Sequence, residues 1–305
     1  MEAAPNIRHL VTPMIQFLLA TVPQLLVTGL MIGSIYALVA LCYYVVHAGT
    51  GVINFAQGDF VVIGLVFTWL FHVDLQLPVW ASLPLTIIAT LAAVAVFERF
   101  AMRPVTSSDP MIPLLITLAG GGLIRSLIQL VWGVKPRLVP HYSGDDPIQL
   151  LDAAILPQAL WIVIGTMVIL LIVYAFFKHT LFGLSMLAAA SDREGARVIG
   201  VNAGMIGLYS FGLSAMISGA TAGLIAPVTN ADPQLGLEFA IKGFAGAILG
   251  GIDKPHAAVV GGLLIGLFEA LISGLISSEY RNLFVFGALM LTLVLRPQGL
   301  LGGRA

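Results

Sequence analysis

The sequence predicts an all-α protein, a polytopic transmembrane helical bundle of about eight to ten spans, with interrupted helices and one short helix at the cytoplasmic face. Of the 305 residues, 59% are apolar and only 10% are charged, whereas soluble domains carry about 25% charged residues. Mean hydropathy is +1.01. Apolar segments long enough to cross a bilayer recur along the whole chain, so we expect an integral membrane protein in contact with lipid.

The apolar segments follow one another without a linker or a shift in composition, which indicates a single domain over residues 1–305. A span takes about 20 apolar residues. Residues 10–20, between two prolines, fit either an interfacial helix or a further span. Segments 53–72 and 237–252 are short or broken by glycine. The expected spans are 22–47, 53–72, 78–100, 111–132, 158–178, 203–228, 237–252, 256–277 and 282–296.

A polar segment at residues 185–200 lies between two apolar segments. Asp192, Arg193, Glu194 and Arg197 place four charges in six positions, beside small residues that favour a short helix. Such a helix between spans offers a docking surface to a cytosolic protein.

The distribution of Lys and Arg supports this orientation, because cytoplasmic loops carry an excess of both. The longest loop, about 133–157, would be exposed on the outer side. The expected cytoplasmic set is Arg99, Arg103, Lys178, Arg193, Arg197, Lys254, Arg296 and Arg304, and the outer set is Arg8, Lys135, Arg137 and Arg281.

Polar residues inside apolar segments are the candidates for a transport path, since a charge at membrane depth costs about 2.5–3.5 kcal/mol on insertion scales. Glu269 lies in mid-helix, so it should be paired or line a cavity, and the same holds for Lys242. An ion pair between the two, or structural hydrogen bonding alone, are alternatives. For Asp59 and Arg125, snorkelling to the interface is another. The full set is Asn54, Gln57, Asp59, Arg125, Lys242 and Glu269.

Two polar elbows, Ile53–Gly64 and Gly250–Gly261, each precede an apolar helix. Paired interrupted segments in the two halves of a transporter indicate internal repeats and a substrate path, although a chance likeness would look the same.

The motifs of several enzyme classes are absent from the sequence. There is no phosphate-binding P-loop, and no pair of histidines has metal-ligand spacing. The net charge of −1 argues against nucleic acid as a partner. We therefore expect no enzyme, and neither a metal nor a cofactor in this chain.

Several stretches in order resemble the branched-chain amino acid ABC-transporter permeases of the LivH type, over about residues 22–302. Where that family usually has Asn-Phe-Ala-His-Gly-Glu, this chain carries Gln57 and Asp59, which removes a titratable imidazole. The stretches are Gly33–Leu41, Gly51–Asp59, Glu98–Val105, Lys242–Ile252, Gly261–Leu271 and Leu295–Gly302.

The resemblance implies that the segment at about 184–200 is a coupling helix, which sits in a groove on a separate cytoplasmic ATPase. The family pattern Glu-Ala-Ala-x-x-x-Gly falls on Glu194–Gly200, with Gly195 in place of the first alanine. The residues expected to couple to the ATPase are Arg193, Glu194, Gly195, Ala196, Arg197 and Gly200.

The expected function is that of a membrane permease subunit of an ABC importer for branched-chain or other hydrophobic amino acids. Relatives with this pattern also carry amides, urea or aromatic acids. The expected path residues are Asn54, Gln57, Lys242 and Glu269. The resemblance implies a homologous or identical second permease, two ATPases that bind the ATP, an extracytoplasmic solute-binding protein, and the bacterial inner membrane. The alternatives are an ATP-independent secondary transporter or channel, with Lys242 and Glu269 relaying protons, and a receptor or structural scaffold.

Overall fold

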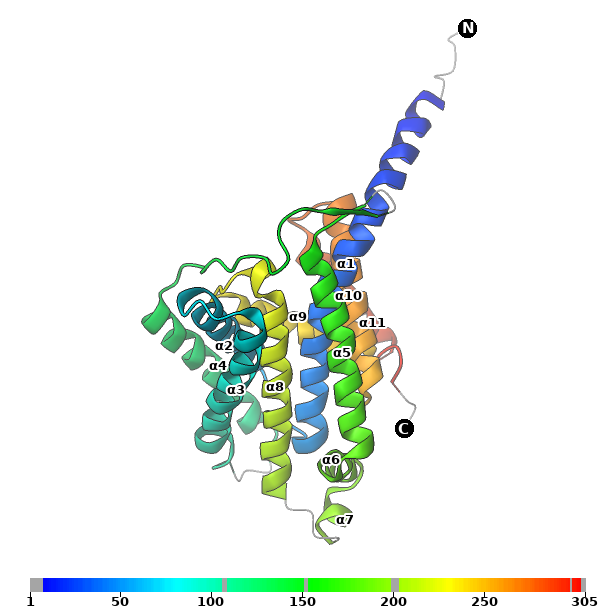
Figure 1. Cartoon of the computed structure of the whole chain (residues 1–305). Helices are drawn as coiled ribbons and strands as arrows, with labels where there is room; N and C mark the ends of the chain where they lie inside the picture. The colour runs from blue at the N-terminus through cyan, green and yellow to red at the C-terminus, as the bar shows by residue number, and fades with distance from the viewer. Residues whose placement is uncertain (1–7, 106–108, 151–152, 199–202, 297, 303–305) are drawn as a thin grey trace.

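The computed structural model describes residues 8–105, 109–150, 153–198, 203–296 and 298–302. It is the helical bundle that the sequence predicts (Figure 1). Its helices are α1 (Arg8–Thr50), α2 (Gln57–Trp69), α3 (Val79–Phe97), α4 (Met111–Trp132), α5 (Pro157–His179), α6 (Leu181–Ser191), α7 (Arg193–Val198), α8 (Ala203–Thr229), α9 (Leu235–Gly250), α10 (Pro255–Leu275) and α11 (Arg281–Leu295), with π-helical turns η1 (Leu70–Asp74) and η2 (Glu98–Met102).

Six helices in the described part of the chain are long and apolar enough to cross a membrane, and they correspond to the expected spans other than 53–72, 237–252 and 282–296. The first two of these exceptions are replaced by shorter helices. The α-helical part of the first is the 13-residue α2, and the second is the 16-residue α9. Both are largely buried among other helices. They are therefore interior helices shorter than the bilayer, in keeping with the interrupted helices that were expected.

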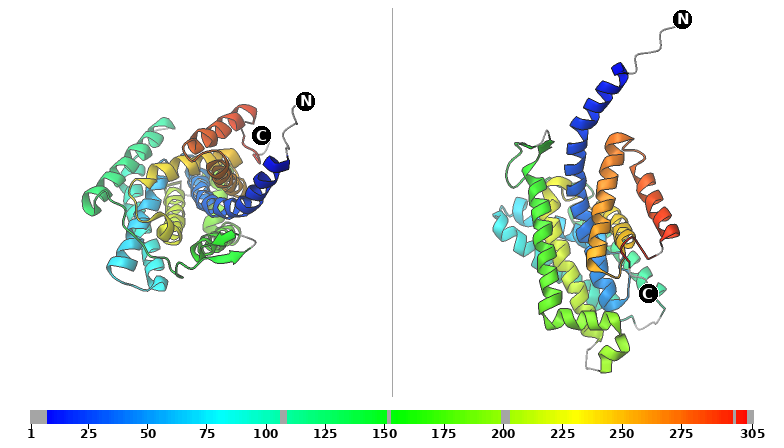
Figure 2. Two further views of the ribbon diagram at one scale, coloured as in Figure 1. Left: turned by 90° about the horizontal axis from the view of Figure 1, so that it is seen from above. Right: turned by 90° about the vertical axis from the view of Figure 1, so that its right-hand side faces the viewer.

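Helix α1 is central to the bundle and contacts α5, α8, α9 and α10. Every side chain from Ile35 to Val46 is buried. Residues 10–20, which had two possible roles, continue this helix beyond the bundle (Figure 2). A methyl group at Gly266 would overlap the backbone at Gly33, so glycine lets α10 approach α1 at van der Waals distance. The core of the fold is this closely packed α1–α10 pair.

The loop between α4 and α5 contains a short antiparallel hairpin of β1 (Ile148–Leu150) and β2 (Ala153–Ile155), which the all-α expectation did not include. The first part of the loop crosses the end of α8, where the Tyr142 hydroxyl donates to the Gly223 carbonyl oxygen at 2.6 Å. Burial raises the pKa of the Tyr142 hydroxyl. The loop is thus packed onto the bundle, although most of its side chains are exposed as expected.

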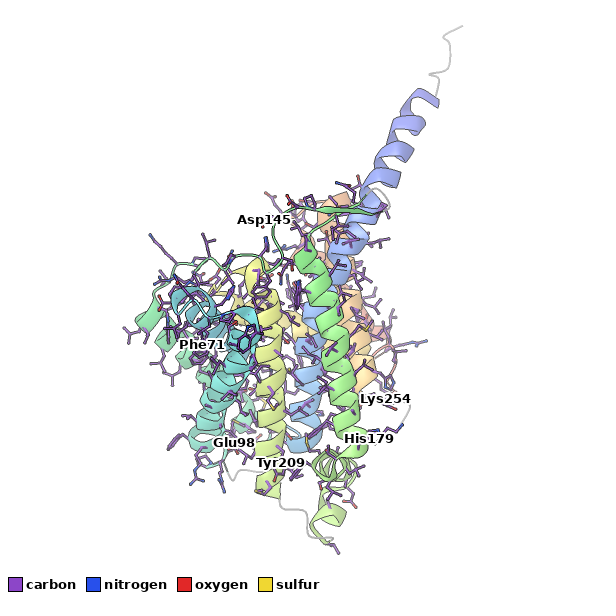
Figure 3. The ribbon with its side chains drawn as sticks, viewed as in Figure 1. Phe71, Glu98, Asp145, His179, Tyr209 and Lys254 are labelled. Atoms are coloured by element: carbon purple, nitrogen blue, oxygen red, sulfur yellow. The ribbon has the colours of Figure 1, made fainter. Side chains whose placement is uncertain are left out.

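The two ends of the bundle carry different residues. Figure 3 shows Glu98, His179, Tyr209 and Lys254 toward the end that holds α6 and α7, and Asp145 at the opposite end. Of the residues in the expected cytoplasmic set, Lys254 thus lies toward the end that holds α6 and α7.

The C-terminal tail folds back on the end of α9. The amide groups of Leu300 and Leu301 donate to the carbonyl oxygens of Leu249 and Gly250, at 2.8 and 2.9 Å. These acceptors belong to the last turn of α9, whose carbonyl groups have no partners within the helix. Gly251 and Gly299, with φ of 122° and 82°, take the left-handed conformations that the turns require.

Candidate functional site

The first turns of α2 and α9 meet inside the bundle. A methyl group at Gly58 would overlap the backbone oxygen of Gly236, so the two helix starts touch through glycine. Short polar turns precede both helices. The Asn54 side-chain oxygen accepts from the Ala56 amide at 3.1 Å, and the Asp232 carboxylate accepts from the Gln234 amide at 2.8 Å. The structure therefore has the elbow expected at Ile53–Gly64. It meets residues 230–236 and not the elbow expected at Gly250–Gly261, which contains the turn before α10.

A buried hydrogen-bond network joins α2 to α8 around Gln57. Its side-chain nitrogen donates to the Ser218 hydroxyl at 2.7 Å, and the Ser214 hydroxyl donates to its side-chain oxygen at 2.7 Å. The Asn54 amide donates to the same oxygen at 3.3 Å. All four side chains are fully buried. The structure therefore brings together Asn54 and Gln57, as two of the expected path residues, and adds the two serines.

The serines were missed by reading residues one at a time. Ser210, Ser214 and Ser218 recur every four positions in α8, which places them on one face of the helix. A polar stripe on an otherwise apolar span was the signal that would have found them.

A second cluster contains the other two expected path residues. The Lys242 ammonium lies 2.7 Å from the Glu269 carboxylate, and their side chains are 2% and 3% exposed. The pairing that the sequence allowed is thus present. Glu238, one helical turn before Lys242, accepts a second bond from the ammonium at 2.5 Å.

The same cluster extends from the buried pair to the surface. Arg281, at the start of α11, lies 3.5 Å from Glu269 and 3.7 Å from Glu238. The Tyr36 ring of α1 lies 5.5 Å from the Lys242 nitrogen, in cation–π range. Two cations and two carboxylates balance one another, so α1, α9, α10 and α11 are joined by a neutral charge cluster.

Asp59 and Arg125 form a third polar contact. The guanidinium donates to both carboxylate oxygens, at 2.9 and 3.1 Å, and Asp59 is 1% exposed. Snorkelling of Asp59 to the interface is therefore wrong. A methyl group at Gly121 or Gly236 would overlap the Asp59 carboxylate. The pair ties α2 to α4 in a space that two glycines leave open.

The expected coupling segment is two helices rather than one. Helix α6 begins at the Thr180 cap, whose side-chain oxygen accepts from the Gly183 amide. Asp192 breaks the helix and caps α7, accepting from the Gly195 amide at 3.0 Å. Short acidic side chains favour this position because they satisfy free amides at a helix start. The two helices lie at one end of the bundle (Figure 1).

The expected coupling residues fall on and after α7. Arg193, Glu194, Gly195, Ala196 and Arg197 belong to the helix, and Ala196 is buried. Gly200 lies outside the described residues. A cavity of about 560 Å³ separates α6 from the end of α1 and from the turn before α10, with Tyr44, His47 and Asp253 in its walls.

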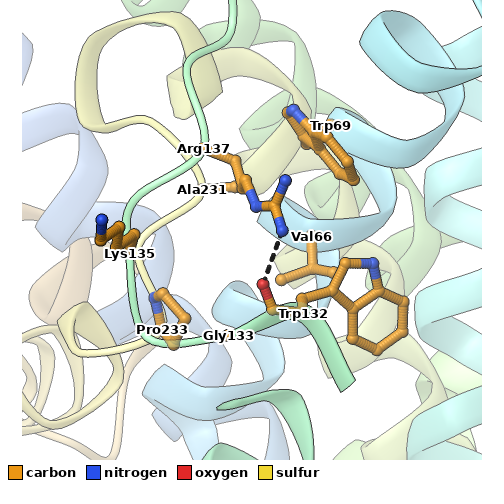
Figure 4. A pocket seen from close by; sticks show the side chains of 8 residues that line it. All are labelled: Val66, Trp69, Trp132, Gly133, Lys135, Arg137, Ala231 and Pro233. Atoms are coloured by element: carbon orange, nitrogen blue, oxygen red, sulfur yellow. Dashed lines mark hydrogen bonds between the residues drawn. The ribbon is translucent and has the colours of Figure 1, made fainter. Parts of the chain in front are cut away.

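The opposite end of the bundle presents cationic side chains around α2. Arg137 lies over the Trp69 ring, 4.9 Å from its centre, and donates to the Trp132 carbonyl oxygen at 2.9 Å. Lys135 lies beside them in the same shallow pocket (Figure 4). A short backbone bridge between Arg137 and Ala231 holds this loop against the elbow before α9.

Long apolar helices around two interrupted ones, with polar clusters buried between them, define a polytopic membrane transport protein. The family model for "Branched-chain amino acid transport system / permease component" matches residues 25–294. The chain belongs to this family. It is therefore a multi-pass membrane protein and a permease subunit of an ABC importer, as the sequence predicted.

Individual relatives agree with this assignment. The chain is 29% identical to the high-affinity branched-chain amino acid transport system permease protein BraD of Pseudomonas aeruginosa, over 92% of this chain and 95% of the relative. It is 28% identical to the LivH permease protein of Escherichia coli, over the same shares. Among solved structures, PsaBC from Streptococcus pneumoniae in complex with Fab gives a TM-score of 0.49 at 12% identity, covering 89% of this chain and 91% of that chain.

Proposed function

We propose that this permease forms the path for branched-chain or similar hydrophobic amino acids, and that the path passes the meeting point of α2 and α9. The buried amide and hydroxyl groups around Gln57 carry the proposal, because polar groups at membrane depth are costly and tend to mark solute paths. The relatives, which are named as branched-chain amino acid permeases, support this solute class.

The expected path residues offer partners for both ends of a zwitterion. Asn54 and Gln57 present neutral donors and acceptors, while Lys242 and Glu269 present opposite charges. Apolar side chains surround both clusters, as a site for a hydrophobic amino acid needs. In this arrangement Gln57 and Lys242 are held by neighbouring polar groups, while one buried carboxylate oxygen of Glu269 has no hydrogen-bond partner among the described residues. Passage of the solute past these contacts requires the helices to separate.

Energy for this separation would come from partners, since ATP is bound by other subunits. Two cytoplasmic ABC ATPases would hold the α6–α7 segment through Arg193, Glu194, Gly195, Ala196, Arg197 and Gly200. A second permease, homologous or identical, would complete the path. An extracytoplasmic binding protein would deliver solute at the opposite end of the bundle. The assembly would lie in the bacterial inner membrane.

A ligand or partner shifts a conformational equilibrium only through different contacts in the two states. The small α7 helix can provide such contacts, because it projects from the bundle and is joined to α5 through α6. Closure of the ATPases on ATP would then move α5 and α8, the helices on either side of the segment.

Reconstitution with defined partners tests the proposal. The permeases, ATPases and binding protein are placed in liposomes, and uptake of radiolabelled leucine is measured with and without ATP. We expect uptake only with ATP and the ATPase. Uptake of leucine by the permease alone would instead establish the ATP-independent transporter. If leucine did not stimulate the ATPase but another solute did, the transported solute would belong to another class.

A further inference from the structure

An apolar groove of about 610 Å³ runs between α2, α3 and α4. Its volume lies within the roughly 300–1,000 Å³ of small-molecule sites. Apolar side chains from all three helices and from η2 line it, including Phe67, Val96, Phe100, Leu127 and Val131. Helix α4 lies at the edge of the bundle and packs on α2 and η2 (Figure 1), which leaves the groove open on the side facing away from the core.

The groove is formed by apolar helices whose exposed side chains face away from the core. Both α3 and α4 are membrane-length helices, and the groove-lining residues Val96 and Leu127 are 57% and 51% exposed. Water would find no hydrogen-bond partners in this apolar groove. If the groove were empty, the side chains that line it would lose dispersion contacts. Hydrocarbon is therefore the chemistry that suits the groove.

Positive charge adjoins this apolar surface. Phe100 and Ala101 line the groove, and Arg99 and Arg103, both exposed, are close to them in the chain. The neighbouring carboxylate of Glu98 is only 4% exposed. The exposed charges next to Phe100 in the chain are thus two guanidinium groups. Figure 3 shows the neighbouring Glu98 toward the end of the bundle that carries α6 and α7.

We propose that this groove binds an anionic phospholipid, with an acyl chain along α3 and α4 and the phosphate held by Arg99 and Arg103. Arginine suits phosphate because its planar donors bond two oxygens at once. Basic pockets between transmembrane helices bind anionic headgroups for this reason. Among the described residues, the two exposed arginines are matched only by the buried Glu98 carboxylate, so charge complementarity favours an anionic headgroup over the apolar helix of a second permease subunit.

Native mass spectrometry of the full-length protein tests the headgroup contact. The protein is equilibrated with equal amounts of phosphatidylglycerol and phosphatidylcholine, and retained lipids are counted. We expect a preference for phosphatidylglycerol of about thirtyfold, from the attraction of two arginines near an anionic headgroup. R99Q/R103Q should lose it, while the control K178Q/K254Q, which removes two charges from the same end, should keep it. Equal loss in both variants, or in neither, overturns the proposal.

A second pair of variants tests the groove itself. Val96→Trp fills it and should reduce lipid retention, whereas Leu115→Trp, on an exposed part of α4 outside it, should not. Unchanged elution on size exclusion shows that both variants fold. Leu127→Cys tests whether a second permease subunit occupies the groove instead. The native Cys42 is buried, so a disulfide between subunits would form through the new cysteine. Rapid oxidative dimerisation of this variant in membranes would show a subunit contact and overturn the lipid assignment.

Discussion

The Lys242 ammonium and the Glu269 carboxylate, separated by 27 positions in the chain, meet at 2.7 Å between α9 and α10. Both side chains are almost completely buried. Removing two charges from water costs several kcal/mol per ion, and only close pairing recovers this cost. The pair therefore matters both to the packing of α9 on α10 and to any solute that separates them.

Removing one member of this pair should destabilise the protein more than removing both. Lys242→Met leaves buried carboxylate charge, and losing one partner of such a pair costs about 3–5 kcal/mol. The double variant K242M/E269L should recover much of that stability. Fluorescence-detected size exclusion after heating measures the loss of folded protein, with exposed Lys178→Met as the control. Equal stability of Lys242→Met and the unmodified protein would contradict this interpretation.

Gly58→Ala should disrupt the contact between α2 and α9. The added methyl group would overlap the backbone oxygen of Gly236, and backbone atoms cannot move aside without shifting a helix. Overpacking of this kind costs about 1–3 kcal/mol or more. Gly122→Ala is the matched control, because a methyl group there has no neighbour within 4 Å. The midpoint of thermal unfolding in detergent should fall for Gly58→Ala alone. A similar fall for both variants would show that the contact between Gly58 and Gly236 is not the cause.

Gln57→Leu should reduce solute uptake while the protein still reaches the membrane. The substitution removes the hydrogen bonds to Ser214 and Ser218 and, on our proposal, a polar contact in the path. One such contact is worth about 1.4 kcal/mol, or roughly tenfold in uptake rate. Uptake of labelled leucine in the reconstituted importer measures the effect, with exposed Gln149→Leu as the control. Full uptake by a well-folded Gln57→Leu protein would remove Gln57 from the path.

Glu194→Arg should uncouple ATP hydrolysis from transport. On our proposal α7 docks on an ATPase whose surface complements it, so reversal of a charge on α7 would weaken that contact. We expect ATPase activity in the complex to lose its stimulation by loaded binding protein, with unchanged membrane insertion. Gly200→Trp should act in the same direction by steric hindrance. Asp109→Arg, a charge reversal at an exposed position just before α4, is the control. Equal ATPase stimulation in all three variants would exclude docking through this segment.

The sequence predicts helix limits best where Pro and Gly mark them. Helix α4 spans the expected residues 111–132 and ends before Gly133, and α5 begins at Pro157. Prolines misled the interpretation at α1, because Pro13 and Pro23 suggested a break. The helix continues past both, as proline permits in membrane helices when neighbours satisfy the freed backbone groups.

The sequence identifies several residues of the candidate site but not the contacts between them. Burial cost identifies Lys242 and Glu269 as residues that need partners, yet hydropathy does not give the rotation of α9 against α10. Glu238 and Arg281 were therefore not included in the cluster. Likewise, residues 230–236 have little apolar character to mark them, and only the contact of Gly58 with Gly236 shows that they belong to the centre of the fold.

The tail contact at Leu249 and Gly250 has a consequence for biosynthesis. Helix α9 is made some 50 residues before Leu300 and Leu301, as the numbering of these partners shows. Its last carbonyl groups can therefore form these bonds only after residues 300 and 301 have been synthesised. A chain cut short after α11 would contain all six membrane-length helices of the described residues but would leave the carbonyl groups of Leu249 and Gly250 without these two donors.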